Sequence, residues 1–514
     1  MLRRVLHAAN AIILGNVITR AGGLILVPLF LKYWSATLYG EYLALFAAAG
    51  YLSSLDIGMQ GAAVNRLTQA YARQDLDEYQ AVQHTALTFF IILAATVTVL
   101  VACLAWLLPI PKWIGLRLTP PAIATQVIIL LAAWVMWSMP VQVATATHQT
   151  MGKLARTQWI RNAQQVIVVV LTSFAVIAGA GMRTIAFLQL LTVGLLALFM
   201  IMELRSQYPA LTPGITGAKL SLLKELMHPS FLFALIMVGN LVAFEGSILL
   251  VSAAMGGLAV AMLSISKSLV DVIRLGLYSI SLAFCPDFAR MEALGELEKL
   301  RRIHRLLVAG TAAITLALVA SFWYEGPEFI SMWTRGRITP DAMLLRLFLV
   351  LMAFQTSWAA SSTVARASNK HNAQAIGYFF AAVIGIAFVA ALLPRLGTWA
   401  VPVGLTLGEA ICCYHFVIKS TCRMINEPYA PFAVRFWFGF VAVATAVLAV
   451  GWIVHMIHAP MLIRWILMGC LTMVVAAACG WVAWLMPEDR LLLLPKLRAQ
   501  LSISDIKTWQ RLNP

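Results

Sequence analysis

Charged residues are scarce in this sequence. Only 11% of its 514 residues are Asp, Glu, Lys or Arg, whereas soluble proteins contain about 25%. Hydrophobic residues make up 61% of the chain, and the mean hydropathy is +0.86. This surplus of apolar residues exceeds what a soluble core needs, and it excludes an ordinary soluble protein. Because no sizeable soluble domain remains, the net charge of +16 is not a sign of nucleic-acid binding.

Signatures of catalysis, cofactors and metals are also lacking. The sequence contains no Walker-type glycine-rich loop, no HExxH, no GxSxG and no CxxC. Cys412, Cys413 and Cys422 lie near His415, but their spacing matches no standard zinc pattern, and helix packing explains them. We therefore predict no catalytic residue, no metal site and no cofactor.

Long apolar runs dominate what is present. A helix needs about 20 predominantly apolar residues to cross a bilayer, and the chain contains about fourteen segments of that length. The sequence therefore predicts an all-α integral membrane protein. Its predicted spans are residues 11–31, 41–62, 85–108, 122–146, 162–181, 184–203, 230–251, 257–283, 304–324, 342–364, 373–393, 398–418, 434–455 and 462–485.

The basic residues indicate the orientation of these spans. An even number of spans places both termini on one side, and Lys and Arg concentrate in the segments on that side. Since basic residues mark cytoplasmic loops, we predict cytoplasmic termini and a location in the cell inner membrane. Arg3 and Arg4 precede an apolar run without a small-residue cleavage site, which predicts a first spanning helix rather than a cleaved signal peptide.

An internal repeat organises the helices. Residues 15–22 read GNVITRAG and residues 239–246 read GNLVAFEG, and Gly40 and Gly257 take equivalent places after them. Six spans separate the two copies, so both run in the same direction, as in parallel transporter repeats; chance similarity between apolar helices is the alternative. The predicted domains are a six-helix lobe (1–208), a cytoplasmic linker (209–229), a second six-helix lobe (230–424), two appended helices (425–487) and a cytoplasmic amphipathic tail (488–514).

Charged residues interrupt the apolar spans. A charge at the bilayer centre costs roughly 2.5–3.5 kcal/mol, so it usually faces a partner or a water-filled cavity. Lys267, Asp271 and Arg274 follow the spacing i, i+4 and i+7, which places them on one helix face. Most of these residues are cations, which predicts a central cavity for an anionic substrate; structural pairing is the alternative. The predicted cavity residues are Arg20, Glu245, Lys267, Asp271, Arg274 and Arg346.

Other polar residues in the spans are candidates for coupling or gating. Asp56 is either a proton or cation site, a partner of Arg20, or the cap of a helix break beside glycines. Glu409 is open to the same alternatives. Asn16 and Asn240 belong to the repeated Gly-Asn pair, and we predict gating roles for them as well.

The N-terminal part resembles a known family. Its elements are Gly15-Asn16 with Arg20, Tyr39-Gly40, Leu-Asp-Ile-Gly at 55–58 and Asn-Arg-Leu at 65–67. They resemble the polysaccharide-export (O-antigen or exopolysaccharide) flippases of the multidrug/oligosaccharidyl-lipid/polysaccharide (MOP) exporter superfamily. The motifs cover about the first 80 residues, and the helical layout extends the resemblance along the chain.

The resemblance implies two parallel six-helix lobes in a V shape, working by alternating access. It implies that undecaprenyl-diphosphate-linked oligosaccharide is flipped from the cytoplasmic to the periplasmic leaflet. Membrane lipid, a polysaccharide polymerase and a chain-length regulator would be its further partners, with no nucleic acid. Drug exporters of the superfamily often carry an acid in the first helix, where this chain has Arg20.

Three alternatives stay open at this point. A small-molecule or drug exporter of the same superfamily is one, and a peptidoglycan lipid-precursor flippase is another. The third is a membrane-embedded glycan polymerase or ligase. The site of such an enzyme would lie in the longest outer loop, at Glu325, Glu328, Arg335 and Arg337.

Overall fold

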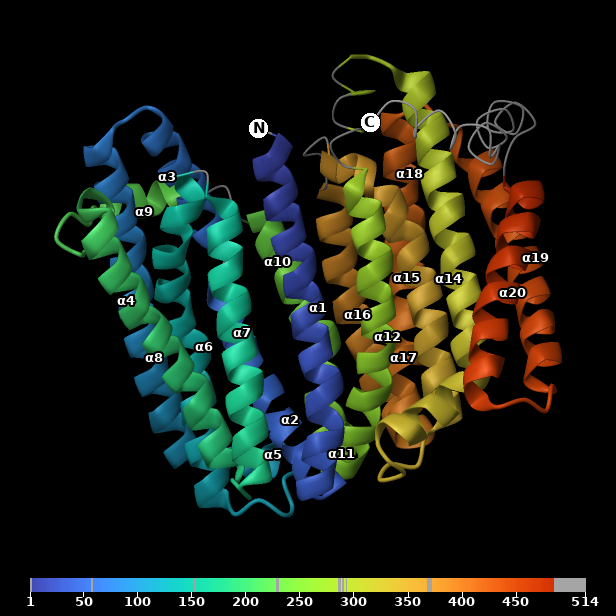
Figure 1. Ribbon diagram of the computed structural model, residues 1–514, viewed down its shortest axis with the longest axis horizontal. Coiled ribbons are helices and arrows are strands. Elements are labelled where there is room, and N and C mark those ends of the chain that lie inside the picture. The colour runs from blue at the N-terminus through green and yellow to red at the C-terminus, as the bar shows by residue number, and fades with distance from the viewer. Residues whose placement is uncertain are drawn as a thin grey trace, which may run out of the picture. The chain divides into compact units, whose positions relative to one another are not determined.

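The computed structural model describes residues 2–56, 59–151, 153–227, 231–284, 288, 291–292, 294–367 and 372–484. Within these residues every regular element is a helix (Figure 1). The prediction of an all-α protein is confirmed.

The helices of the first part of the chain are long and separated by short turns. Ser35 starts the second of them, because its side chain accepts a hydrogen bond from the Leu38 amide. The elements are α1 (Leu2–Tyr33), α2 (Ala36–Gly50), η1 (Tyr51–Asp56), α3 (Met59–Ala72), α4 (Leu76–Leu107), α5 (Ile110–Trp113), α6 (Pro121–Thr150), α7 (Leu154–Ile177), α8 (Met182–Gln207), η2 (Pro209–Leu211) and α9 (Leu220–Met227).

The later helices include two π-helical segments, η4 and η6. Such segments are rare and are often found at functional sites. The elements are α10 (Phe231–Asn240), η4 (Leu241–Glu245), α11 (Gly246–Met255), α12 (Gly257–Ala283), α14 (Leu297–Trp333), α15 (Ala342–Ala367), α16 (Asn372–Leu396), η5 (Gly397–Trp399), α17 (Ala400–Glu409), η6 (Ala410–Tyr414), α18 (His415–Met424), α19 (Tyr429–His455) and α20 (Met461–Ala483).

The helices show that this is a multi-pass membrane protein. Ten helices of the described residues are long and apolar enough to cross a membrane, or eleven if the bent pair Ala36–Asp56 and Met59–Thr68 is one span. One of the ten, Asn372–Met424, contains two of the predicted spans. The other two predicted spans correspond to α1, whose apolar part is Ala21–Tyr33, and to α12, which carries three charged residues.

The run from Asn372 to Met424 must cross twice. At 1.5 Å per residue, 53 helical residues would extend about 80 Å, more than twice the hydrocarbon thickness. The chain turns at Gly397, whose φ of +57° favours glycine. After this turn α17 packs back along α16. The two helices are so close that a Cβ on Gly408 would overlap the Ala381 carbonyl oxygen. Small residues permit such close helix contacts in membranes.

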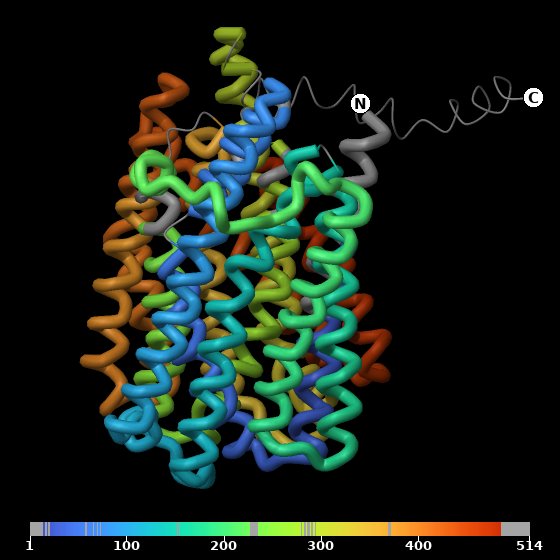
Figure 2. Tube along the Cα trace, turned by 90° about the vertical axis from the view of Figure 1, so that its left-hand side faces the viewer, coloured from blue at the N-terminus to red at the C-terminus, as the bar shows by residue number. Residues whose placement is uncertain are grey.

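The chain forms two compact units that interleave along the sequence. In the first unit α1 packs against α7, and α6 packs against both α4 and α8 (Figure 1 and Figure 2). In the second unit α19 packs against α20. The first unit comprises Met1–Val272, Glu328–Leu347 and Ala375–Cys412, and the second comprises Ile273–Pro327, Phe348–Gln374 and Cys413–Pro514.

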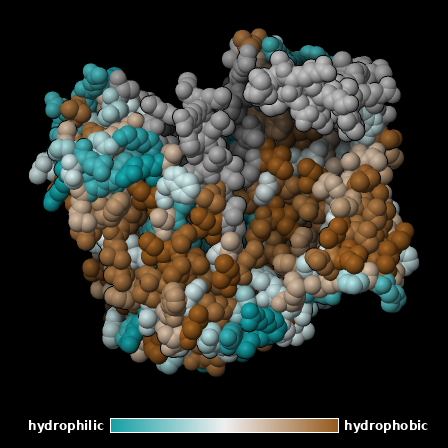
Figure 3. All heavy atoms as spheres, viewed as in Figure 1, coloured by the Kyte–Doolittle hydropathy of each residue, from teal (hydrophilic) through white to brown (hydrophobic). Residues whose placement is uncertain are grey.

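The outer surface of the first unit is apolar where lipid is expected. Ile92, Val99 and Leu100 of α4 are 60%, 63% and 52% exposed. On the face shown in Figure 3, apolar side chains form a broad band over this unit, with hydrophilic residues toward its ends. This arrangement is the one a spanning bundle requires, because lipid replaces water around its middle.

Polar contacts hold the segment after α8 against α4. Gln80 and Gln83 donate to the carbonyl oxygens of Ala210 and Leu211 at 3.0 and 3.3 Å. The Lys219 amide donates to Thr85 Oγ1 at 2.9 Å. These bonds hold residues 210–219 along the start of α4.

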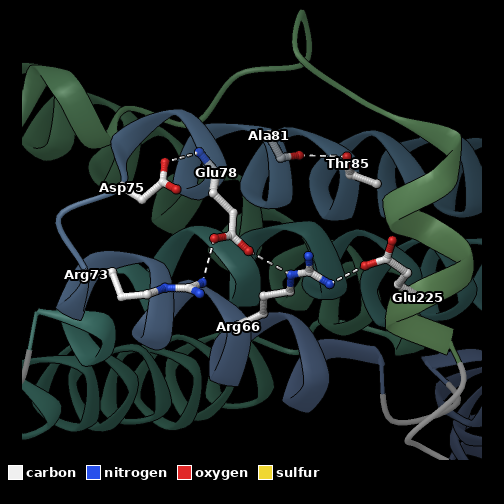
Figure 4. Close-up of polar contacts among 7 residues, drawn as sticks. All are labelled: Arg66, Arg73, Asp75, Glu78, Ala81, Thr85 and Glu225. Atoms are coloured by element: carbon white, nitrogen blue, oxygen red, sulfur yellow. Dashed lines mark hydrogen bonds and ion pairs between the residues drawn. The ribbon is translucent and has the colours of Figure 1, made fainter.

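Helix α9 is fixed by a network of ion pairs (Figure 4). Arg66 of α3 lies between Glu78 of α4, at 3.0 Å, and Glu225 of α9, at 2.5 Å. Arg73 contacts the second oxygen of Glu78 at 2.5 Å. Figure 4 shows the two arginines converging on the Glu78 carboxylate, so Glu78 joins α3 to α4 and Arg66 joins both to α9.

Candidate substrate-binding site

A cavity of about 720 Å³ lies inside the first unit. Its wall is built from α1, α2, α6, α7 and α8, and Ser268 of α12 also lines it. The volume falls in the range of about 300–1,000 Å³ that is typical of small-molecule sites. The described part of the chain thus contains an internal space large enough for a ligand.

Glycines of α1 allow α1 and α7 to approach closely beside this cavity. A Cβ on Gly22 would lie 2.6 Å from Cγ2 of Val169, and a Cβ on Gly15 would overlap the amide of Asn162. Both glycines line the cavity, as does Gly23, around which no atom lies within 4 Å of a Cβ position. The α1 glycines therefore give helix contact at some levels and open space at another.

Neutral amides are the main polar groups of the wall. Two of them donate hydrogen bonds within the wall. Gln158 Nε2 donates to Asn162 Oδ1 at 3.0 Å, and Gln189 Nε2 donates to the Tyr42 hydroxyl at 3.1 Å. Gln189 Oε1 is buried and has no hydrogen-bond partner. The lining amides are Gln142, Gln158, Asn162, Gln164, Gln165 and Gln189.

Aromatic rings form another part of the wall. Phe46 lies 5.3 Å from Trp134 between ring centroids, and Phe30 stacks on Tyr39 at 5.2 Å. These distances are typical of favourable ring pairs, so the rings hold one another in position. All four residues line the cavity together with Tyr42. The site therefore combines hydrogen-bonding amides with flat apolar surfaces.

One charged residue, Arg161, is among the described residues of the cavity wall. Among the described lining residues it is the one side chain charged at neutral pH, and none is a carboxylate. Its Nη2 donates to Gln142 Oε1 at 3.0 Å.

The structure brings together Glu245, Lys267 and Asp271. Lys267 Nζ lies 2.5 Å from Asp271 Oδ2 and 4.5 Å from the ring centroid of Phe244. Both charges interact electrostatically with Glu245, which ends the π-helical segment η4. Lys267 directly precedes Ser268, which lines the cavity. We call Glu245, Lys267 and Asp271 the α12 charge cluster.

The other predicted cavity residues belong to α1, α12 and α15. The side chains of Arg20 and Asn16 lie outside the described residues, although both positions belong to α1. Arg346 is half-buried on α15, and Arg274 belongs to the second compact unit. Both arginines have interaction partners.

Three coupling candidates have structural contacts. Asp56 Oδ1 accepts a hydrogen bond from the Gln60 amide at 3.1 Å, which is the contact expected if Asp56 caps α3. Asn240 donates to the Ile236 carbonyl at 2.9 Å and accepts from the Tyr378 hydroxyl at 3.0 Å, so it joins α10 to α16. Glu409 is 5% exposed and directly precedes η6.

The loop residues considered for an enzyme serve helix contacts. Glu325 pairs with Arg464 at 2.7 Å and with His455 at 2.8 Å. Arg337 donates to the Leu31 carbonyl at 3.0 Å.

Sequence reasoning missed the amides of the cavity and also missed Glu41. The amides carry no charge, so the pattern of charged residues in the spans does not reveal them. Their signal was nevertheless present, because Gln158, Asn162 and Gln165 recur at i, i+4 and i+7 and so share one face of α7. Glu41 was hidden in an apolar run, although it is fully buried and accepts four hydrogen bonds.

Comparison with known proteins identifies the fold. No protein-family model and no curated protein matches the sequence. Among solved structures, an inward-facing multidrug resistance MATE family transporter of the MOP superfamily superposes with a TM-score of 0.66 and 17% identity, covering 80% of this chain and 94% of its own. The lipid II flippase MurJ, in an inward closed conformation, gives 0.67 and 13%, covering 92% and 98%. A MATE in the straight conformation gives 0.57 and 16%, covering 82% and 96%.

These likenesses define the architecture. The chain has the fold of MOP-superfamily transporters, and its structural neighbours are membrane transporters and a flippase. At 13–17% identity the likeness concerns the fold.

Proposed function

We propose that this protein flips undecaprenyl-diphosphate-linked oligosaccharide from the cytoplasmic to the periplasmic leaflet by alternating access. The observation that carries this proposal is the charge of the cavity. Within a transporter fold, its described lining includes Arg161 and no carboxylate. Such a wall suits a neutral or anionic polar substrate, whereas a cationic drug would lack a counter-charge there.

The extent of the structural likeness also supports a flippase. The lipid II flippase covers 92% of this chain, compared with 80–82% for the two MATE structures described above. Of these three neighbours, the one that covers more of this chain is the flippase of a lipid-linked substrate.

Transport of such a substrate requires a polar path. Buried polar groups without partners cost several kcal/mol each in hydrocarbon, so sugars and a diphosphate do not cross unaided. A protein cavity that supplies hydrogen bonds removes this barrier while the polyprenyl tail stays in lipid. We assign the cavity amides and the α12 charge cluster to this path.

The predicted charged residues take the following roles in the proposal. Arg20, Arg274 and Arg346 bind the diphosphate, since a guanidinium matches phosphate oxygens bidentately, and Lys267 adds a point charge. Glu245 and Asp271 orient these cations. Coupling or gating is assigned to Asp56, Glu409, Asn16 and Asn240. Inner-membrane location, cytoplasmic termini and the two six-helix lobes belong to the same proposal, as do a polymerase and a chain-length regulator as partners.

Two further candidates have specific support. The MATE neighbours favour a small-molecule exporter, and the lipid II flippase favours a peptidoglycan-precursor flippase. The experiment below separates both from the main proposal.

The test is depletion of the protein in cells, followed by leaflet-resolved measurement of undecaprenyl-diphosphate-linked oligosaccharide. Accumulation in the cytoplasmic leaflet with loss of surface polymer is the expected result. Accumulation of peptidoglycan precursor with lysis would assign the protein to that pathway instead. Normal leaflet distribution with drug hypersensitivity would assign a small-molecule exporter, and accumulation in the periplasmic leaflet would point to a polymerase or ligase.

Variants connect this result to residues. Arg20→Ala and Arg274→Ala are each expected to abolish surface polymer while the folded protein remains in the membrane. Lys32→Ala is the matched control, because Lys32 is an exposed cation near the end of α1. Normal polymer with both arginine variants would contradict the assignment of the cation site.

A further inference from the structure

We propose that the cavity of the first unit binds uncharged sugar rings of the lipid-linked oligosaccharide, separately from the cations that bind its diphosphate. This inference rests on the proposed function and adds a division of labour within it. Its evidence is the composition of the cavity wall and the hydrogen-bonding state of particular side chains.

The first argument is hydrogen-bonding capacity. A sugar ring carries several hydroxyl groups, each of which donates and accepts. An amide side chain also does both, with two donors and an acceptor oxygen, whereas Lys and Arg only donate and carboxylates only accept. Six amides line this one cavity. A wall of this composition matches hydroxyl groups without requiring charge on the ligand.

The second argument is an acceptor left without a partner. The Gln189 amide nitrogen is engaged by the Tyr42 hydroxyl at 3.1 Å, while Gln189 Oε1 is buried and unpaired. A buried acceptor without a hydrogen bond is unfavourable, because it has lost water without replacement. A substrate hydroxyl that reached Gln189 Oε1 would supply the missing donor.

The third argument is the aromatic surface. Sugar rings expose C–H groups on their faces, and these pack favourably on aromatic rings through apolar contact and weak hydrogen bonds. Trp134 and Phe46 lie 5.3 Å apart at the wall, next to Ser138 and Gln142 of the same helix as Trp134. Stacking and hydrogen bonding are thus available to one ring at the same time.

The fourth argument is the placement of charge. Arg161 is the one charged side chain among the described lining residues, and its guanidinium donates to Gln142. The α12 charge cluster includes Lys267, which directly precedes the lining residue Ser268. A diphosphate bound by this cluster would leave the attached sugars near the cavity.

The experiment uses the purified full-length protein and three probes. These are the lipid-linked oligosaccharide extracted from depleted cells, the free oligosaccharide released from it, and undecaprenyl diphosphate. Gln189→Leu and Gln142→Leu are expected to weaken binding of the free oligosaccharide about tenfold, since each removes an amide that can hydrogen-bond to a sugar hydroxyl. Their affinity for undecaprenyl diphosphate should be unchanged. Lys267→Ala should give the reverse pattern.

Controls keep the test decisive. Gln126→Leu is matched, because Gln126 is an exposed amide on α6 that does not line the cavity. If either variant fails to fold, Gln165→Leu on α7 replaces it. The proposal is overturned if the free oligosaccharide does not bind the wild-type protein, or if the glutamine variants bind it normally. It is equally overturned if they lose affinity for undecaprenyl diphosphate to the same extent.

The result separates this inference from the proposed function. Normal sugar binding by the glutamine variants, together with flipping of lipid-linked oligosaccharide by the wild type, would remove the sugar site and keep the flippase. Absence of flipping by the wild type would instead remove the flippase assignment itself.

Discussion

Two polar regions of the first unit, the one around Glu41 and the cavity, differ in how completely their buried groups are satisfied. Around Glu41, both carboxylate oxygens are occupied: they accept the amides of Arg117, Leu118 and Thr119 at 2.7–2.8 Å and the Thr119 hydroxyl at 2.5 Å. In the cavity, Gln189 Oε1 is buried and has no partner. A completed network specifies structure, whereas an unpaired acceptor beside a cavity can accept a hydrogen bond from a ligand.

The Glu41 region also contains a close approach of two helices. A Cβ on Gly40 of α2 would overlap the carbonyl oxygen of Gly257, and a Cβ on Gly257 would overlap that of Thr37. Gly40 and Gly257 hold equivalent positions in the predicted repeat. Contact between equivalent residues is expected near a two-fold axis, because symmetry brings a residue there against its own counterpart.

The largest effect is expected from breaking this contact. In Gly40→Leu the new side chain would meet backbone rather than a flexible side chain, so α2 and α12 must separate. We expect loss of folded protein, measured as the monodisperse fraction after size-exclusion chromatography in detergent. Gly194→Leu is the control, since Gly194 is exposed on α8 with no atom within 4 Å of its Cβ position. Normal yield of Gly40→Leu would show that the helices are not held together here.

The next largest effect is expected at Glu41. Glu41→Ala leaves three amide N–H groups without their acceptor, and each buried unsatisfied group costs about 1–3 kcal/mol. We expect a destabilisation of about 3 kcal/mol or more, seen as a lower thermal unfolding temperature of the purified protein. Binding of free oligosaccharide by the surviving folded fraction should be unchanged. Loss of sugar binding at full stability would reverse the roles assigned to the two regions.

A second completed network, in the second unit, should behave like Glu41. Glu325 of α14 is 4% exposed and pairs with Arg464 of α20 and His455 of α19. Removing one partner of a buried ion pair leaves the others uncompensated, at a cost of about 3 kcal/mol. Glu325→Ala should therefore lower the unfolding temperature and make α19 and α20 easier to cleave by limited proteolysis. Unchanged proteolysis would mean that apolar packing alone holds the two helices.

Hydropathy was sufficient to predict the helical architecture, because each spanning segment must be apolar along its own length. It also placed Lys267, Asp271 and Glu245 as a group worth examining, and these three do lie together. The amide cavity was not predicted, since it joins residues of five helices and none of its amides is charged. Glu41 was missed for a related reason: its partners lie in a loop more than 70 residues away, and local sequence does not reveal such a distance.

The smallest effect is expected where the polar network is complete but exposed. Glu225 of α9 is 55% exposed and pairs with Arg66, and exposed pairs contribute only about 0.2–1 kcal/mol. Glu225→Gln should lower the unfolding temperature slightly, and only at low ionic strength, because salt screens exposed charges. Glu78→Gln is the informative companion, since Glu78 is 21% exposed and binds both Arg66 and Arg73. A larger loss for Glu225→Gln than for Glu78→Gln would show that exposure does not determine the strength of these networks, and would weaken the contrast between Glu41 and the cavity.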